Sequence, residues 1–198
     1  MFEEKIHHIR RQTPDENEIN AAVEALKNAK KPMIIAGGGV QYSRAVKKLT
    51  KFAEETQIPV VETIAGRANL IDSHDLNIGP IGVTGSDSAN NIAEEADVIL
   101  SIGCRLQDFT TGSWTAFAKD AQIISLNAAR HDAGKHRSLP VVGDAKIGIG
   151  KIWDALGTYK APDAWVNFAR DERAKWVKYV ADNVNTKSSD GSNRPNSY

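Results

Sequence analysis

Met33-Ile34-Ile35-Ala36-Gly37-Gly38-Gly39-Val40 is the stretch that decides the fold of this chain of 198 residues. Its first half is a continuous apolar run, as expected for a strand buried on both faces of a sheet. Three consecutive glycines follow, and glycine permits a tight turn in which the backbone comes close to a ligand. The stretch therefore predicts a buried strand that ends in a tight turn.

The segments on either side of this stretch are expected to be helical. Residues 13–28 open with Thr13-Pro14-Asp15-Glu16, which is typical of a helix start capped by Thr13. Apolar residues at helical spacing predict a second helix after Ser43, which we expect to cap it. The apolar run at residues 58–61 predicts the next strand, so the pattern is strand, helix, strand.

The same alternation continues towards the C-terminus. Apolar runs predict strands at residues 97–102, 122–126 and 141–142, with helices at residues 89–96 and 144–156. Strands that are apolar at successive positions are buried on both faces, and their alternation with helices is typical of a parallel sheet. The expected fold class is α/β: a doubly wound, mainly parallel, Rossmann-like sheet with helices on both faces.

The composition restricts the partners and the compartment. Basic and acidic residues both number 25, so no general field draws nucleic acid to the chain. No apolar run approaches the roughly 18 to 20 residues of a membrane span, and the start of the chain lacks the apolar core of a secretory signal. The single cysteine, Cys104, excludes an internal disulfide. We expect a cytoplasmic protein that binds neither nucleic acid nor membrane.

The ends of the chain differ from its middle. We expect residues 1–12 to be an arm from a preceding domain and residues 13–160 to be the central domain. Residues 161–185 carry large apolar residues at spacings of three and four, which predicts an amphipathic helix. Its aromatic face either covers the domain's own helices or forms an interface. Residues 186–198 have almost nothing to bury and are typical of a linker to a C-terminal domain.

Candidate ligand-binding residues follow from the position of the strands, because ligands of doubly wound sheets bind at the carboxyl ends of the strands. The first candidates are Gly37, Gly38 and Gly39. Gly37 and Gly39 fit the start of a dinucleotide fingerprint, but Tyr42 occupies its third glycine position. The alternative is that these glycines serve a tight strand-to-helix turn and nothing else.

A second glycine-rich loop contributes Gly82, Thr84, Gly85 and Ser86. It opens a predicted helix, whose free N–H groups can hold an anion. The alternative is that Ser86 and its neighbours merely cap that helix. The two interpretations stay open.

A third segment, residues 103–114, follows the most apolar strand and places Arg105 at its end. The guanidinium can fork onto a phosphate or pair with Asp108. Cys104 has no base beside it in sequence, so a small core residue is favoured over a nucleophile. The histidines have no recognised metal spacing, and we assign neither a catalytic residue nor a metal ligand in this chain.

Taken in order, the motifs resemble the central domain of thiamine-diphosphate-dependent enzymes of the acetolactate synthase type. The matching pieces lie between residues 12 and 157: Lys31-Pro32 before the glycine stretch, Ile58-Pro59-Val60, Thr63 with Gly66, residues 79–85 with Ala89-Asn90, Ala96-Asp97, Gly103-Cys104-Arg105 with Asp108 and Thr111-Gly112, and Gly143-Asp144-Ala145. Details around residues 82–86 and 108–114 most resemble members that open a cyclic diketone by hydrolysis of a carbon–carbon bond in myo-inositol catabolism.

The resemblance implies a division of labour between domains. It places thiamine diphosphate and Mg²⁺ outside this stretch, in flanking domains of the same polypeptide, so the isolated stretch is expected to be inactive. It implies a small-molecule substrate and a homo-oligomer for the parent enzyme.

Some members hold FAD or ADP in this domain, but Phe109 stands where flavin-binding synthases carry arginine, and Asn127 where an acid often ends the strand. FAD or ADP is therefore disfavoured, and the cleft is vestigial or mainly structural. The alternatives are an FAD- or ADP-binding central domain and a stand-alone nucleotide-binding or interaction module.

Overall fold

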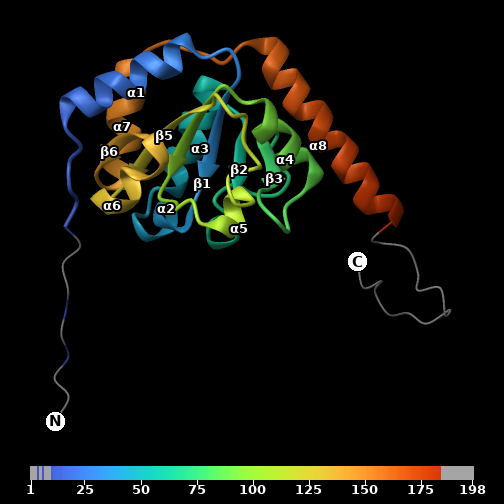
Figure 1. The fold of residues 1–198 in the computed structure, drawn as a ribbon, viewed down its shortest axis with the longest axis horizontal. Helices are drawn as coiled ribbons and strands as arrows, with labels where there is room; N and C mark the ends of the chain where they lie inside the picture. The colour runs from blue at the N-terminus through green and yellow to red at the C-terminus, as the bar shows by residue number, and fades with distance from the viewer. Residues whose placement is uncertain (1–3, 5, 7–9, 184–198) are drawn as a thin grey trace.

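A computed structural model gives the structure of residues 4, 6 and 10–183. Its centre is a parallel sheet in the order β3-β2-β1-β4-β5-β6 (Figure 1). The strands are β1 (Pro32–Ala36), β2 (Val60–Glu62), β3 (Asn77–Pro80), β4 (Val98–Ile102), β5 (Gln122–Asn127) and β6 (Leu139–Val142). Because β1 lies between β2 and β4, the chain turns in opposite directions from β1 and from β4, which creates a switch point between them. The predicted fold class is confirmed.

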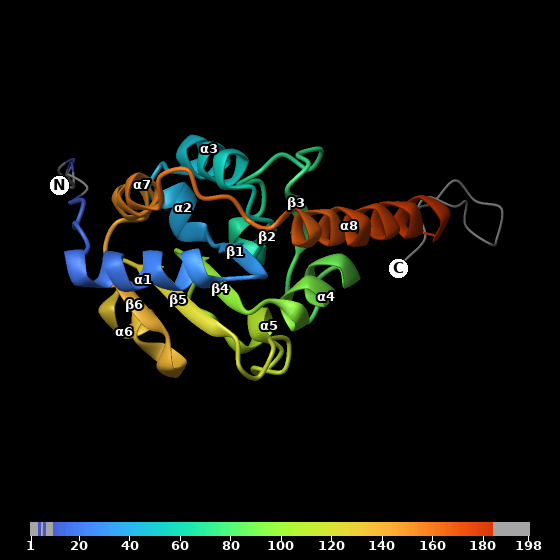
Figure 2. The same cartoon turned by 90° about the horizontal axis from the view of Figure 1, so that it is seen from above.

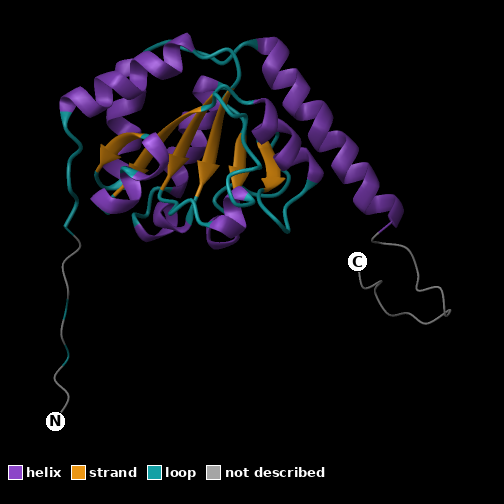
Figure 3. Ribbon diagram, viewed as in Figure 1, coloured by secondary structure: helices purple, strands orange, loops and turns teal. Residues whose placement is uncertain are grey.

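Helices cover both faces of this sheet (Figures 2 and 3). They are α1 (Glu16–Asn28), α2 (Gly38–Tyr42), α3 (Val46–Thr56), α4 (Asp87–Glu95), α5 (Asp108–Thr111), α6 (Arg130–Ala133), α7 (Ala145–Leu156) and α8 (Asp163–Asn183), with short 3₁₀ turns η1 (Ile64–Gly66) and η2 (Lys135–Arg137). The long predicted helices are therefore present, and the short ones lie in connections that the sequence did not mark as helical.

The core has two layers because strand side chains alternate between the faces of the sheet. In β1, Ile34 and Ala36 pack on the layer that α1, α3 and α7 complete. Met33 and Ile35 pack on the opposite layer with α4 and the start of α8. All four side chains are fully buried, as the continuous apolar run predicted.

Three details differ from the sequence-based expectations. The edge strand β3 was not predicted, since its sequence Asn-Ile-Gly-Pro contains three residues that strands disfavour. Asp15 rather than Thr13 caps α1, and its side chain accepts a hydrogen bond from the Asn17 N–H. Ser43 does not cap the following helix, which begins only at Val46.

The ends of the chain are only partly described. The predicted linker at residues 186–198 lies outside the described residues, as does much of the predicted arm at residues 1–12. A helix, α8, lies within residues 161–185, the segment predicted to form an amphipathic helix. Among the described residues, no helix combines the length and the apolar character needed to cross a membrane.

Candidate functional site

A cleft of about 820 Å³ lies at the carboxyl ends of β1, β4, β5 and β6. It is therefore at the switch point of the sheet, where the connections diverge and leave a crevice. Its walls come from the start of α2, the loop after β4, the end of β5 and the start of α7. The volume falls in the range of about 300 to 1,000 Å³ that small-molecule sites occupy.

The glycine turn after β1 forms one wall of the cleft through Gly38 and Gly39. Its backbone is bound to the neighbouring strand: the Gly37 N–H donates to the Ile102 carbonyl at 2.9 Å, and the Gly39 N–H donates to the Gly103 carbonyl at 3.0 Å. A Cβ on Gly37 would overlap the Gly103 carbonyl and lie 2.8 Å from the Cys104 Cα. The glycines thus let two backbones meet, and the N–H groups of Gly37 and Gly39 are already engaged.

A clamp that the sequence did not reveal closes the far side of the cleft. The Arg11 guanidinium donates to both carboxylate oxygens of Asp144, at 2.9 and 3.0 Å, and to the Ser43 carbonyl at 2.8 Å. The Ser43 hydroxyl donates to Asp144 at 2.7 Å, and Asp144 caps α7. Only the capping role of Asp144 was readable from local sequence, because Arg11 lies 133 residues away from it.

The charged groups of the cleft leave it positive. Asp144 is paired with Arg11, and Asp132 is paired with Lys135 at 2.5 Å. Arg105 is exposed, and within the described part of the chain its one hydrogen bond is to the Gln107 side chain at 3.5 Å. No described ion pair joins Arg105 to Asp108, so the structural pair considered from the sequence is not formed.

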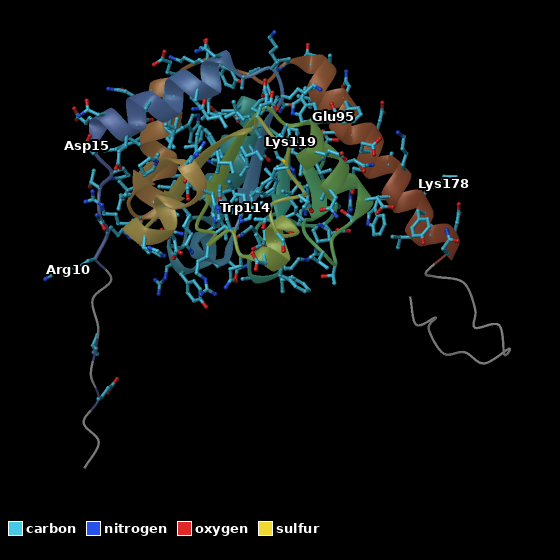
Figure 4. The ribbon with its side chains drawn as sticks, viewed as in Figure 1. Arg10, Asp15, Glu95, Trp114, Lys119 and Lys178 are labelled. Carbon is cyan, nitrogen blue, oxygen red and sulfur yellow. The ribbon has the colours of Figure 1, made fainter. Side chains whose placement is uncertain are left out.

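Two further charged residues, Arg10 and Asp108, are less well placed than Arg105 to meet a ligand in the cleft. Arg10 is on its outer rim, and its side chain points away from the fold (Figure 4). Asp108 begins α5 with an exposed side chain and does not line the cleft. Arg105 is therefore the cation best placed to meet a ligand.

Asn127 and Phe109, which the resemblance led us to weigh against flavin binding, differ in their surroundings. The Asn127 amide donates to the Cys104 carbonyl at 3.0 Å and accepts from the Ala129 N–H at 3.0 Å, so both of its ends are engaged. Phe109 lines the cleft with its ring half exposed. Burial raises the pKa of the Cys104 thiol, which keeps it protonated and suits a core residue rather than a nucleophile.

The second glycine loop does not reach the cleft. None of Gly82, Thr84, Gly85 and Ser86 lines it. Gly82 exchanges two hydrogen bonds of 3.0 Å with the Asn90 side chain, and the Ser86 hydroxyl accepts from the Ala89 N–H at the start of α4. The structure brings Arg105 together with residues 37–39, whereas residues 82–86 lie outside the cleft, with Gly82 and Val83 against α5.

The cleft can therefore take an anion beside an apolar group, and it offers no acid–base pair. Both of its carboxylates are held by cations. Within residues 4, 6 and 10–183, no group of three or more His, Cys, Asp or Glu side chains is placed to hold a metal ion.

Comparison with known proteins places the chain in a family. The profile of the thiamine pyrophosphate enzyme central domain matches residues 19–152. Over 176 residues, or 89% of this chain, the chain is 41% identical to the 3D-(3,5/4)-trihydroxycyclohexane-1,2-dione hydrolase of Geobacillus thermodenitrificans, of which the match covers 27%. It is 39% identical over 179 residues to the hydrolase of the same name from Clostridium tetani, covering 90% of this chain and 28% of that protein. The chain thus spans just over a quarter of the length of these relatives.

Proposed function

The chain belongs to the thiamine pyrophosphate enzyme family, as a central domain, and from this we propose that it serves a hydrolase acting on 3D-(3,5/4)-trihydroxycyclohexane-1,2-dione. The observation that carries the proposal is the identity of about 40% over nearly the whole chain to two hydrolases of that name. The parent enzyme would use thiamine diphosphate and Mg²⁺ on a small-molecule substrate. It would be a cytoplasmic homo-oligomer, with neither nucleic acid nor membrane as partner.

The described residues of this chain do not fit the diphosphate cofactor and its metal. Mg²⁺ with a diphosphate is usually bound through one or two carboxylates, whereas the cleft carboxylates of Asp132 and Asp144 are bound to Lys135 and Arg11. No other described cluster of acidic side chains substitutes for them. We therefore propose that the cofactor binds to flanking domains of the polypeptide and that this domain holds them in place.

A scaffolding role agrees with how the cleft is built. The centre of the domain is fixed by backbone contacts between the residue 37–39 turn and Gly103. The Arg11–Asp144–Ser43 clamp ties the segment before α1 to the start of α7. A chain segment that enters from a preceding domain would thereby reach this domain in one fixed direction.

Exchange of the matched segment tests the proposal. The matching 27% of the Geobacillus thermodenitrificans hydrolase is replaced by this chain, and hydrolysis of the dione is measured with thiamine diphosphate and Mg²⁺. We expect the exchanged enzyme to retain at least a tenth of the parent activity. The matched control is the same exchanged enzyme with Gly37→Ala, which disrupts the central turn. This variant should lose the hydrolase activity. A folded exchange enzyme without activity would contradict the proposal.

The positive cleft favours a second candidate function, an anion site of the nucleotide type. Arg105 is without a carboxylate partner among the described residues, beside the half-exposed ring of Phe109. ADP and FAD would present a diphosphate to the first and a planar ring to the second. Because both ends of the Asn127 amide are already hydrogen-bonded within the protein, this side chain is not free to bind a ribose, and we expect weak nucleotide binding.

Calorimetric titration with ADP, FAD and inorganic diphosphate tests this second candidate. We expect binding that Arg105→Ala weakens by about tenfold or more, as for loss of one charged hydrogen-bonding partner. Lys47→Ala removes one exposed charge from α3, outside the cleft, and should leave the affinity unchanged. Absence of heat at millimolar ligand would exclude a nucleotide site.

A further inference from the structure

The last helix, α8, consists of two unlike halves. In the first half Trp165, Val166, Ala169 and Glu172 are buried against the domain, and the Trp165 indole donates to the Pro32 carbonyl at 2.8 Å. Beyond Glu172 no residue of the helix is buried. The second half continues past the sheet (Figures 1 and 2). We call residues 173–183 the overhang.

The buried stripe of α8 runs on into the overhang. Trp165, Ala169 and Glu172 follow one another at spacings of four and three, which places them on one face of the helix. Trp176 and Val180 extend the same face by two further turns. The face that packs on α4 therefore continues into the overhang, where Trp176 and Val180 are only partly buried, and Arg173 at its start still pairs with Asp72 of the loop before β3.

The two sides of the overhang differ in chemistry. Trp176 stacks on Tyr179 with ring centroids 5.5 Å apart, and Tyr179 is 50% exposed. Lys178 lies on the side that faces away from the sheet (Figure 4), where it pairs with Asp182. Charged side chains on one side and large apolar ones on the other are typical of a helix that packs on a partner.

The matches to relatives extend over this helix. The match to the Clostridium tetani hydrolase covers 179 of the 198 residues, so a continuous match includes everything from residue 20 to residue 179. The family-wide match ends at residue 152. Most of α8 thus belongs to the stretch shared with the dione hydrolases and lies outside the stretch shared with the family as a whole.

The size of the face argues for a partner in the same polypeptide. The overhang is about 16 Å long, and one face of a helix of that length has a contact area of roughly 300 Å². A stable contact between free proteins needs about 800 Å² on each partner. A covalent connection removes this requirement, because it raises the effective concentration of the partner to about millimolar. The hydrolases carry nearly three quarters of their length outside the matched segment.

We infer that the overhang is a docking helix, whose apolar face packs in an apolar groove of a neighbouring domain of the same polypeptide. The inference rests on the proposed function, which supplies that domain. Trp176 and Val180 would enter the groove, while Lys178 and Asp182 stay in water. Docking at this point would fix the neighbouring domain beside the β3 edge of the sheet.

Hydrogen exchange measured by mass spectrometry tests the inference in two proteins: the 198-residue chain and the active segment-exchange hydrolase described above. We expect the amides of residues 173–183 to exchange at least tenfold more slowly in the hydrolase. Trp176→Ser with Val180→Ser should abolish the difference. Ala174→Ser with Ala181→Ser places serine on the opposite face of the helix and should preserve the difference in exchange rate. Val180→Ser alone is the milder variant, and exchange in β1 reports whether each variant is folded.

Equal, fast exchange of the overhang in the chain and in an active hydrolase would overturn the inference and leave the proposed function standing. A folded hydrolase without activity would overturn the proposed function instead, and the inference with it. If the amides of residues 173–183 already exchange slowly in the isolated 198-residue chain, the inference is also overturned. A dependence on protein concentration would then identify a second copy as the occupant, and loss of protection on ending the chain after Asn183 would identify its own last residues.

Discussion

The turn at residues 37–39 and the loop at residues 82–86 are both rich in glycine, both follow a strand, and both lead into a helix, yet they have different environments. The first lies at the switch point and lines the cleft. The second lies after the edge strand β3 and packs under α5. Sequence patterns of this kind report where two backbones must approach, and only the topology of the sheet decides whether a cleft opens beside them.

The two segments also differ in what holds them. The turn at residues 37–39 is held by backbone hydrogen bonds to β4 and to the Gly103 carbonyl. The loop at residues 82–86, at the edge of the sheet, is held by backbone hydrogen bonds from Val83 to Phe109 and from Ser86 to Pro80, and in addition by the side chains of Asn90 and Ser86. Backbone contacts in the sheet centre cannot shift without moving a strand, whereas side chains at the edge can change rotamer. Substitutions should therefore be much more costly in the first segment than in the second.

Gly37→Ala is expected to have the largest effect. The φ and ψ angles of Gly37, −99° and 178°, suit any residue, so the cost is purely steric. The added Cβ would overlap the Gly103 carbonyl and lie 2.8 Å from the Cys104 Cα, both backbone atoms. We expect a loss of at least about 3 kcal/mol in the free energy of unfolding, measured by urea denaturation.

Gly134→Ala is the matched control for that substitution. A Cβ at Gly134 would meet only the Arg130 carbonyl oxygen, at 3.5 Å, and its φ of −92° is ordinary. The free energy of unfolding should change by less than about 0.5 kcal/mol. Equal losses of unfolding free energy in the two variants would show that the close approach of Gly37 to Gly103 is not the cause of the destabilisation.

Gly82→Ala probes the second segment. Gly82 has a φ of +113°, which residues with a Cβ rarely adopt, and a Cβ would overlap the Phe109 carbonyl oxygen and lie 3.0 Å from the Thr110 Cα. The exposed neighbours Val83 and Thr84 leave the loop room to move. We expect a loss of about 2 kcal/mol in urea denaturation, smaller than for Gly37→Ala. A larger loss here than at Gly37 would reverse the comparison.

Most of the fold was predictable from the sequence because its signals are local. The apolar runs identified β1, β4 and β5, and helical spacing identified α1, α3 and α7. The strand β3 was not predictable, since Asn77, Gly79 and Pro80 disfavour strands and only pairing with β2 makes them one. Helix caps were partly misassigned, because Thr13 and Asp15 are both good caps and the sequence does not show that α1 begins after Asp15.

The candidate site was predictable in part. Its location at residues 37–39 and 103–105 follows from strand ends alone. The clamp of Arg11 on Asp144 was not predictable, because no sequence signal relates residues 133 positions apart. Residues 82–86 were proposed on composition, and their binding role stays a prediction that the geometry does not favour. The distance between the two glycine segments depends on the order of strands, which the sequence pattern leaves open.

Ser86→Ala is expected to weaken the edge loop by an intermediate amount. The Ser86 hydroxyl accepts from the Ala89 N–H at 3.2 Å and so caps α4. Its loss should cost about 1 kcal/mol in the free energy of unfolding. Thr84→Ala, in the same loop but with an exposed side chain, is the matched control and should be neutral. A neutral Ser86→Ala would mean that the loop is held by its backbone, as the central turn is.

Glu172→Gln is expected to change the free energy of unfolding least. Its effect should also be the only one that depends on pH, because the charged carboxylate of Glu172 joins α8 to Asn91 of α4. The Asn91 amide donates to the Glu172 carboxylate at 2.6 Å, and Lys175 pairs with its other oxygen at 2.5 Å. The hydrogen bond from Lys175, followed by that from Asn91, lowers the pKa of Glu172 despite its burial. At pH 7 the loss should be below about 1 kcal/mol, since glutamine keeps an acceptor for Asn91 and the lysine is exposed.

The pH dependence of this variant distinguishes a charge effect from a packing effect. A carboxyl whose pKa is lower in the folded state stabilises the fold fully above the pKa of the unfolded chain, about 4.3 for glutamate. That contribution is lost as the pH falls through the lowered pKa of the folded state. The stability advantage of the wild type over Glu172→Gln should therefore be smaller at pH 3 than at pH 7, whereas the loss in Gly37→Ala should be the same at both values. Thermal unfolding of the three proteins at both pH values measures this, and a constant difference for Glu172→Gln would assign the effect to packing, as at the central turn.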